Sequence, residues 1–232
     1  MKKYPILFAI LLLPGLIFIF FNSMQPDYQP LPKLGIRTFD PNIQDTIYHT
    51  IQDFEFVAHT GKVVNSDWLG DYIYVANFFF TSCPSPDFCP KMSKSMNLVQ
   101  SKFYGSDDVK LLSITVDPER DSVPVLAKYA EEYKAVPNKW YFLTGQKSKI
   151  YDLIKTSYLL SAIDGDDDPD AFIHTDKFVL IDKSKRIRGY YSGRDEQDVK
   201  NLITDIKILQ QEYSHQTVRH NKIEDRGAKK ND

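Results

Sequence analysis

Hydrophobic and polar residues along the chain mark out a series of short strands and amphipathic helices. Two runs, residues 72–80 and 109–116, are almost continuously apolar, which predicts central strands buried on both faces. Between them, residues 90–103 place apolar side chains at helical spacing, with a proline at the start of the predicted helix. Residues 51–57 alternate, and a turn leads to a return strand at 63–64, which predicts a hairpin.

The second half of the chain continues this alternation of strands and helices. The predicted elements are a helix at 123–133, a strand at 139–143, a helix at 149–158, strands at 177–181 and 186–191, and a helix at 196–211. Strands that alternate with helices form a parallel sheet covered on both faces, and the last two strands add an antiparallel hairpin. We therefore predict an α/β fold with an N-terminal β-hairpin and a central mixed sheet flanked by helices.

The start of the chain predicts a membrane anchor. Lys2 and Lys3 precede an apolar run at 4–21, whose helical length of about 27 Å nearly crosses the hydrocarbon core of a bilayer. Positive residues before the run favour a cytoplasmic N-terminus, which puts the rest of the chain on the extracytoplasmic, periplasmic side. The alternative is a cleaved signal peptide, although residues 21–26 make a poor cleavage site.

These patterns divide the chain into four parts. Residues 1–24 are the predicted anchor or signal sequence, and residues 25–48, rich in proline at their start, form an extended spacer. Residues 49–212 form the folded domain, and residues 213–232 form a polar, disordered tail.

The net charge and the number of cysteines limit which functions the chain can have. The formal net charge of −2 gives no basic excess of the kind that nucleic-acid binding needs. The 232-residue chain has only 2 cysteines, Cys83 and Cys89, and they lie close together. A disulfide scaffold would use more cysteines at wider spacing, so the pair indicates a redox or metal site.

The two cysteines fall between a buried strand and the start of a helix, where ligand sites of open α/β sheets lie. Cys89 directly precedes Pro90, and the free N–H groups of a helix start lower the pKa of a thiol. Pro84 and Pro86 keep the loop out of helical conformation. We expect the five intervening residues to bring the two sulfurs together.

Three segments carry a resemblance to a known family. The segments are 78–92, which holds both cysteines, 115–121, and 174–182, which begins with a histidine. In this order they resemble the signatures of Sco/SenC proteins over residues 52–208. That family has a thioredoxin-like fold and delivers copper to the binuclear copper site of cytochrome c oxidase subunit II. The resemblance implies the same fold and a membrane-anchored copper-binding protein.

By this resemblance Cys83, Cys89 and His174 are the copper ligands. Two thiolates and an imidazole suit Cu(I) and accommodate Cu(II). Asp117 ends a buried strand beside the predicted site, either as a residue that tunes the ligands or as the start of a turn before Pro118. The family normally has three residues between its cysteines, and the five found here are a departure that bears on metal geometry and reduction potential.

Two further functions stay open. A thiol–disulfide oxidoreductase would use Cys83 and Cys89 as a redox pair to reduce the cysteines of an acceptor, without His174. A thiol peroxidase is a third possibility, although the residues around Cys83 match that pattern poorly. An acidic loop at 164–170 lacks the calcium-binding pattern and is expected to be solvated. The remaining histidines are expected at the surface: His49, His59, His215 and His220.

Overall fold

The computed structural model describes residues 12–17, 29–160 and 175–228. The chain divides into two compact units, Met1–Pro30 and Leu31–Asp232. Within the described ranges, no helix combines the length and the apolar character needed to cross a membrane. Most of the segment 1–24, with its predicted anchor, lies outside those ranges, and the anchor stays a prediction.

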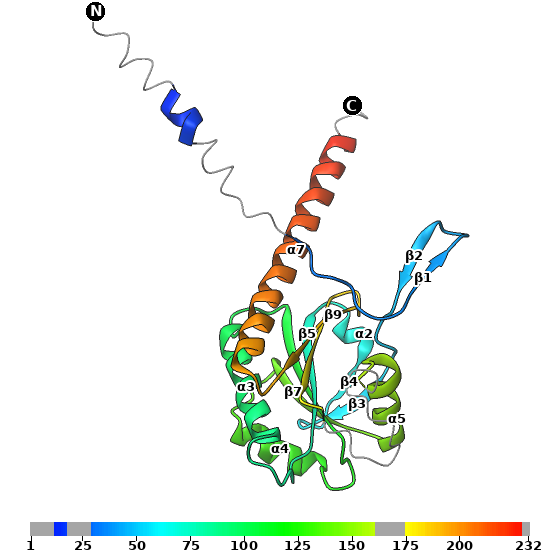
Figure 1. Cartoon of the computed structure of the whole chain (residues 1–232), viewed down its shortest axis with the longest axis vertical. Helices are drawn as coiled ribbons and strands as arrows, with labels where there is room; N and C mark the ends of the chain where they lie inside the picture. The colour runs from blue at the N-terminus through cyan, green and yellow to red at the C-terminus, as the bar shows by residue number, and fades with distance from the viewer. Residues whose placement is uncertain (1–11, 18–28, 161–174, 229–232) are drawn as a thin grey trace, which may run out of the picture. The chain divides into compact units, whose positions relative to one another are not determined.

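The Leu31–Asp232 unit is built on a mixed sheet that has seven strands within the described residues (Figure 1). In spatial order the strands are β4 (Val63–Asn65), β3 (Glu55–Ala58), β7 (Trp140–Thr144), β6 (Val109–Thr115), β5 (Ile73–Phe79), β8 (Lys177–Ile181) and β9 (Ile187–Ser192). Strands β5, β6 and β7 run parallel, and the hairpins β3–β4 and β8–β9 join them antiparallel on either side. The predicted central mixed sheet is confirmed.

Helices cover both faces of this sheet (Figure 1). One face carries α3 (Cys89–Lys102), α4 (Val123–Glu132) and α7 (Glu196–Ala228), and the other carries α2 (Ser66–Leu69) and α5 (Lys147–Asp152), which continues as the π-helical turn η1 (Leu153–Ser157). The predicted flanking helices are therefore present, and α3, α4 and α5 with η1 lie within a few residues of their expected bounds.

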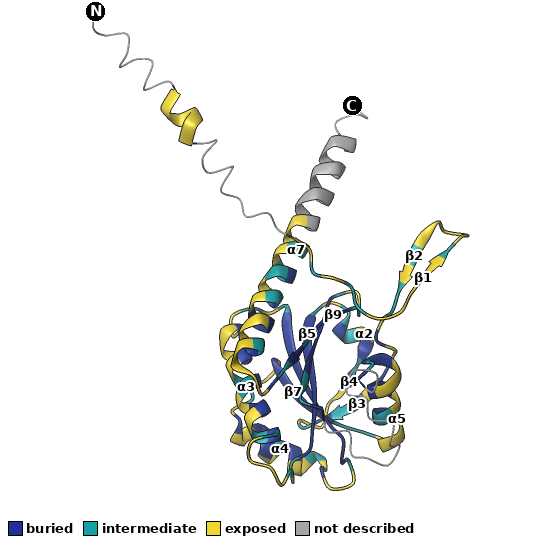
Figure 2. Ribbon diagram, viewed as in Figure 1, coloured by how far each residue is buried: buried dark blue, intermediate teal, exposed yellow. Residues whose placement is uncertain are grey.

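The central strands are buried on both sides, as their apolar runs predict. Every residue of β5 and β6 is buried (Figure 2). Successive side chains of a strand point to opposite faces. Phe79 accordingly contacts Tyr129 of α4, with ring centroids 5.1 Å apart, whereas Phe78 contacts Tyr158 after η1, also at 5.1 Å. Two apolar layers thus hold the strand that leads to the cysteines.

The predicted extended spacer at 25–48 is wrong in its second half. Residues Arg37–Asp40 (β1) and Asp45–Tyr48 (β2) form an antiparallel hairpin, separate from the central sheet. An Asp40 carboxylate oxygen accepts a hydrogen bond from the Asn42 N–H at 2.8 Å, and Gln44 adopts a left-handed φ of 52°. These two local features close the turn.

The last helix is longer than its predicted end at 211. Helix α7 runs to Ala228, through the segment expected to be a disordered tail. No glycine or proline occurs between residues 213 and 226, so nothing in the backbone ends the helix earlier.

A buried ion network joins the start of this unit to its last strand and last helix. The guanidinium of Arg188 in β9 contacts Asp182 at 2.8 Å and Glu212 of α7 at 2.7 Å, and the Arg188 side chain is 1% exposed. It also donates hydrogen bonds to the carbonyl oxygens of Leu31 and Pro32. The guanidinium thus binds two carboxylates and two carbonyl oxygens at once. Its removal would leave all four of these groups without this hydrogen-bond donor.

We predict that Arg188→Ala lowers the free energy of unfolding by about 3–5 kcal/mol, because breaking a buried ion pair leaves uncompensated charge. Urea denaturation of the full chain measures this loss. The control is Arg37→Ala, which removes an exposed arginine of β1 and should change stability by less than about 0.5 kcal/mol. Equal, small effects of both substitutions would contradict the stabilising role of the network.

Candidate functional site

The two cysteines lie in the loop that joins the central strand β5 to α3. Cys89 is the first residue of α3 and is 1% exposed, whereas Cys83 is half-buried. Both are free thiols. The Cys83 thiol donates to the carbonyl oxygen of Ser85 at 3.7 Å, and the Cys89 thiol is in hydrogen-bonding contact with that of Cys83. The loop therefore brings the two sulfurs together, as the sequence predicts.

Burial changes the expected acidity of Cys89. The sequence predicts a lowered pKa at the helix start, but burial raises the pKa of Cys89 to about 12. The backbone N–H of Phe80 acts in the opposite direction, while contact with Cys83 adds to the rise. The prediction of a stabilised thiolate at Cys89 is wrong, because loss of water around the sulfur outweighs the helix N–H groups.

An aromatic cluster forms the wall behind Cys89. The ring centroid of Tyr129 in α4 lies 5.1 Å from that of Phe79 and 4.7 Å from that of Tyr133. Both tyrosines are close enough to Cys89 for an electrostatic interaction with its sulfur. The Tyr129 hydroxyl is 3.1 Å from the Ser93 hydroxyl on α3. These rings exclude water from one side of the dithiol, which leaves Cys83 on the accessible side.

Asp121 fixes the base of the cysteine loop, a role that sequence reasoning missed. Its carboxylate accepts hydrogen bonds from the Thr81 N–H at 3.1 Å, from the Thr81 hydroxyl, and from the Thr115 hydroxyl at 2.5 Å. Asp121 is 0% exposed. Thr81 follows β5 and Thr115 ends β6, so one buried carboxylate ties together the ends of two central strands. No local sequence signal marks this role, because Asp121 is 40 positions from Thr81 in the chain.

Asp117 lies beside Thr115, whose hydroxyl accepts a hydrogen bond from the Asp117 N–H at 3.0 Å, and its predicted role as a residue that tunes the ligands stays a prediction. It is 3% exposed, and one of its carboxylate oxygens accepts no hydrogen bond from the described residues. That oxygen is 3.3 Å from Nε of Arg120, whose side chain is 70% exposed. A buried carboxylate oxygen without a hydrogen bond from the described residues can accept a contact from a ligand or a partner group.

His174 lies outside the described residues, so its predicted place near the thiols stays a prediction. The described chain resumes at Thr175, which is buried, and continues with Asp176. Among the residues that the structure describes, no group of three or more His, Cys, Asp or Glu side chains could hold a metal ion. The structure therefore describes two of the three residues in the predicted ligand set, Cys83 and Cys89.

Two of the histidines expected at the surface are half-buried and structural. A ring nitrogen of His49 is 2.7 Å from the carbonyl oxygen of Ser157. The His59 ring accepts a hydrogen bond from the Phe142 N–H at 3.2 Å, and burial lowers its pKa. His215 is exposed, as predicted, and the side chain of His220 lies outside the description.

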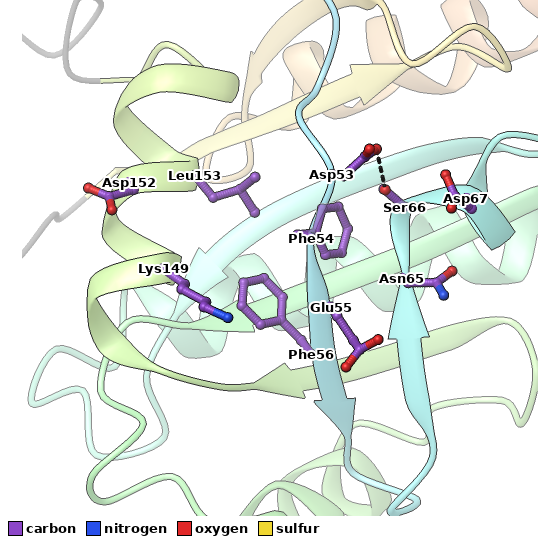
Figure 3. Close-up of a pocket in the computed structure, with 10 residues that line it drawn as sticks. All are labelled: Asp53, Phe54, Glu55, Phe56, Asn65, Ser66, Asp67, Lys149, Asp152 and Leu153. Atoms are coloured by element: carbon purple, nitrogen blue, oxygen red, sulfur yellow. Dashed lines mark hydrogen bonds between the residues drawn. The ribbon is translucent and has the colours of Figure 1, made fainter.

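A pocket of about 520 Å³ lies elsewhere, between the β3–β4 hairpin and α5 (Figure 3). Phe54, Phe56 and Leu153 line it together with Lys149, and a hydrogen bond from Ser66 to Asp53 closes one rim. Neither cysteine lines it, and Asp117 does not. The pocket is therefore separate from the chemistry that the sequence predicts.

The fold and the cysteine site together define the structural class of this domain. A dithiol between a central parallel strand and a helix start, in a mixed sheet covered by helices, is the arrangement of a thioredoxin-like domain. The chain belongs to the SCO1/SenC family, whose family model matches residues 44–210.

Similar proteins support this membership. The chain is 28% identical over 166 residues to the SCO1 protein homolog of Bacillus subtilis (strain 168), covering 71% of this chain and 85% of that protein. It is 29% identical over 206 residues to a SCO2-like protein of Rickettsia typhi, covering 87% of this chain and 96% of that protein.

Solved structures share the fold. A SCO1/SenC family lipoprotein from Bacillus anthracis has a TM-score of 0.60 at 26% identity and covers 69% of this chain and 95% of its own. BsSco, a member of the Sco family of cytochrome c oxidase assembly proteins with a disulfide switch, has a TM-score of 0.58 at 28% identity, covering 68% and 92%. Bradyrhizobium japonicum ScoI with copper bound has a TM-score of 0.55 at 22% identity, covering 69% and 99%, and shows the same fold.

The difference in burial predicts unequal reactivity of the two thiols. Burial raises the pKa of Cys89, which lowers the amount of reactive thiolate, and it also shields the sulfur from reagent. We expect iodoacetamide to modify Cys83 in Cys89→Ser at least about tenfold faster than Cys89 in Cys83→Ser. Equal rates, followed by mass spectrometry of the folded protein, would contradict the buried position of Cys89.

The hydrogen bonds of Asp121 to Thr81 and Thr115 lead to a prediction about stability. Asp121→Asn keeps the shape of the side chain but turns one acceptor into a donor, which leaves a buried threonine group without its partner. We expect the free energy of unfolding to fall by about 1–3 kcal/mol in urea denaturation. Glu119→Gln removes an exposed carboxylate two residues away and is the control. A variant as stable as wild type would show that the tie does not hold the strand ends.

Proposed function

We propose that this chain is a membrane-anchored copper-binding protein that delivers copper to the binuclear copper site of cytochrome c oxidase subunit II. Its ligands are Cys83, Cys89 and His174. The observation that carries the proposal is the dithiol, whose two sulfurs are in contact at the end of the central strand with one side walled by aromatic rings.

The donor set supports copper as the cargo. Thiol sulfur is a soft donor that selects Cu(I), and an added imidazole extends the set to Cu(II). Family membership supports the same reading, since BsSco belongs to the Sco family of cytochrome c oxidase assembly proteins. Sco proteins of Bradyrhizobium japonicum, Arabidopsis thaliana and yeast with copper bound have the same fold.

The raised pKa of Cys89 suits a protein that releases its cargo. Metal binding requires deprotonated thiols, so loading copper expels the Cys89 proton, and proton return favours release. An acceptor thiolate can enter beside the more exposed Cys83 and displace the protein ligands one at a time. Asp117, buried beside the loop with an oxygen open to a further contact, is the residue that we assign to tuning the ligands or contacting the acceptor.

The anchored, extracytoplasmic location belongs to the proposal as well. It rests on the apolar run at 4–21 behind two lysines, and on the need of a copper carrier to meet an oxidase subunit on that side.

Copper analysis of the reduced full chain in detergent tests the proposal. We expect about one copper per wild-type chain and loss of most of it in Cys83→Ser, Cys89→Ser and His174→Ala. The control His215→Ala, which changes an exposed histidine of α7, should bind as wild type does. Full binding by all three ligand variants would overturn the copper assignment.

A thiol–disulfide oxidoreductase is the second candidate, favoured by the direct contact between the thiols and by the disulfide switch of BsSco. The Cys83 thiolate would attack an acceptor disulfide, and Cys89 would resolve the mixed disulfide. Two electrons then pass to the acceptor as a Cys83–Cys89 disulfide forms. Acceptor reduction that survives His174→Ala, but not Cys83→Ser, would favour this function.

A further inference from the structure

The loop between the cysteines is held from outside by an arginine of another segment. Arg194 lies in the turn after β9, and its Nε donates a hydrogen bond to the Asp87 carbonyl oxygen at 3.1 Å. Its guanidinium carbon lies 4.9 Å from the centroid of the Phe88 ring. Asp87 and Phe88 are the last two residues before Cys89, so Arg194 contacts the loop immediately before the buried thiol.

The turn that carries Arg194 is itself fixed to the start of β8. The Ser192 hydroxyl donates to the Asp176 carboxylate at 2.5 Å, and the Gly193 N–H donates to the Asp176 carbonyl at 2.7 Å. A side chain at Gly193 would come within 2.5 Å of the Phe178 ring, which shows how closely the turn packs on β8. Arg194 thus projects from an ordered base.

We infer that Arg194 is a positioning residue that holds the cysteine loop in its dithiol arrangement. The same turn contacts the Cys89 side of the loop through Arg194 and the chain two residues beyond His174 through Asp176. It links the two segments that carry the proposed ligands. The inference rests on the proposed function for the use of the dithiol, but its measurement needs no copper.

The direction of the effect follows from the contacts. A disulfide requires an S–S distance of about 2.05 Å, much shorter than a hydrogen bond between two thiols. Both cysteines are free thiols in this structure, so the contacts of Arg194 with Asp87 and Phe88 are those of the dithiol form. Arg194 therefore stabilises the dithiol relative to the disulfide, and its removal favours oxidation.

The experiment measures the dithiol–disulfide equilibrium of the full chain in detergent. Dithiothreitol buffers set the balance: the Cys83–Cys89 disulfide takes two electrons and two protons from the reagent, which becomes its cyclic disulfide. A maleimide mass tag counts free thiols, and the chain has only these 2 cysteines. We expect Arg194→Ala to shift the equilibrium towards the disulfide by about three- to tenfold. A tenfold shift equals about 30 mV.

Two further variants separate positioning from a general loss of structure. Arg194→Lys keeps the charge over Phe88 without the Nε contact and should lie between wild type and Arg194→Ala. Lys200→Ala, on an exposed position of α7, should leave the equilibrium unchanged. In a double-mutant cycle, Phe88→Leu should remove part of the effect of Arg194→Ala, because the two residues share one contact. Urea unfolding establishes that each variant is folded.

The outcomes separate this inference from the proposed function. An unchanged equilibrium in Arg194→Ala, or an equal shift in Lys200→Ala, overturns the positioning role even if copper binds as proposed. A shift in Arg194→Ala with no copper bound by wild type supports the positioning role and overturns the copper proposal instead.

Discussion

The buried carboxylate of Asp121 sets the point from which the cysteine loop leaves the sheet. The β5–β6 ladder ends with the pair Phe79 and Thr115, and Asp121 then binds Thr115 and Thr81, the second residue past the ladder. Hydrogen bonds in a buried site are stronger than those exposed to water, and Asp121 is fully buried. The backbone two residues before Cys83 is therefore fixed by the core, while the rest of the loop depends on contacts of its own.

The environment of Cys89 is a competition between two effects that act on the same sulfur. A helix N-terminus stabilises a nearby negative charge by about 0.3–1 kcal/mol when exposed, and up to about 2 kcal/mol when partly buried. The pKa of Cys89 is nevertheless raised, and loss of water around the sulfur is the largest cause. Burial of Cys89 beside the aromatic cluster therefore outweighs the effect of the helix N–H groups on its pKa. Cys89 is therefore held as a neutral thiol by its surroundings, although it stands at the start of a helix.

Local patterns predicted the elements of the sheet because continuous apolar runs and their bounding turns decide which strands are buried. They missed the β1–β2 hairpin, whose turn depends on the hydrogen bond of Asp40 and the left-handed backbone of Gln44. The proximity of the two thiols followed from a short loop. The Asp121 and Arg194 contacts did not, because they join residues 40 and 107 positions apart, and only the folded topology brings such segments together.

The same topology separates the point where the chain enters this unit from its dithiol. Arg188 binds the carbonyl of Leu31 next to the β8–β9 turn, and Ile181 at that turn pairs with Tyr74 near the start of β5. Cys83 follows the other end of β5, a strand of seven residues that spans about 23 Å. Whatever precedes Leu31 therefore joins the unit about one strand length from the cysteine loop.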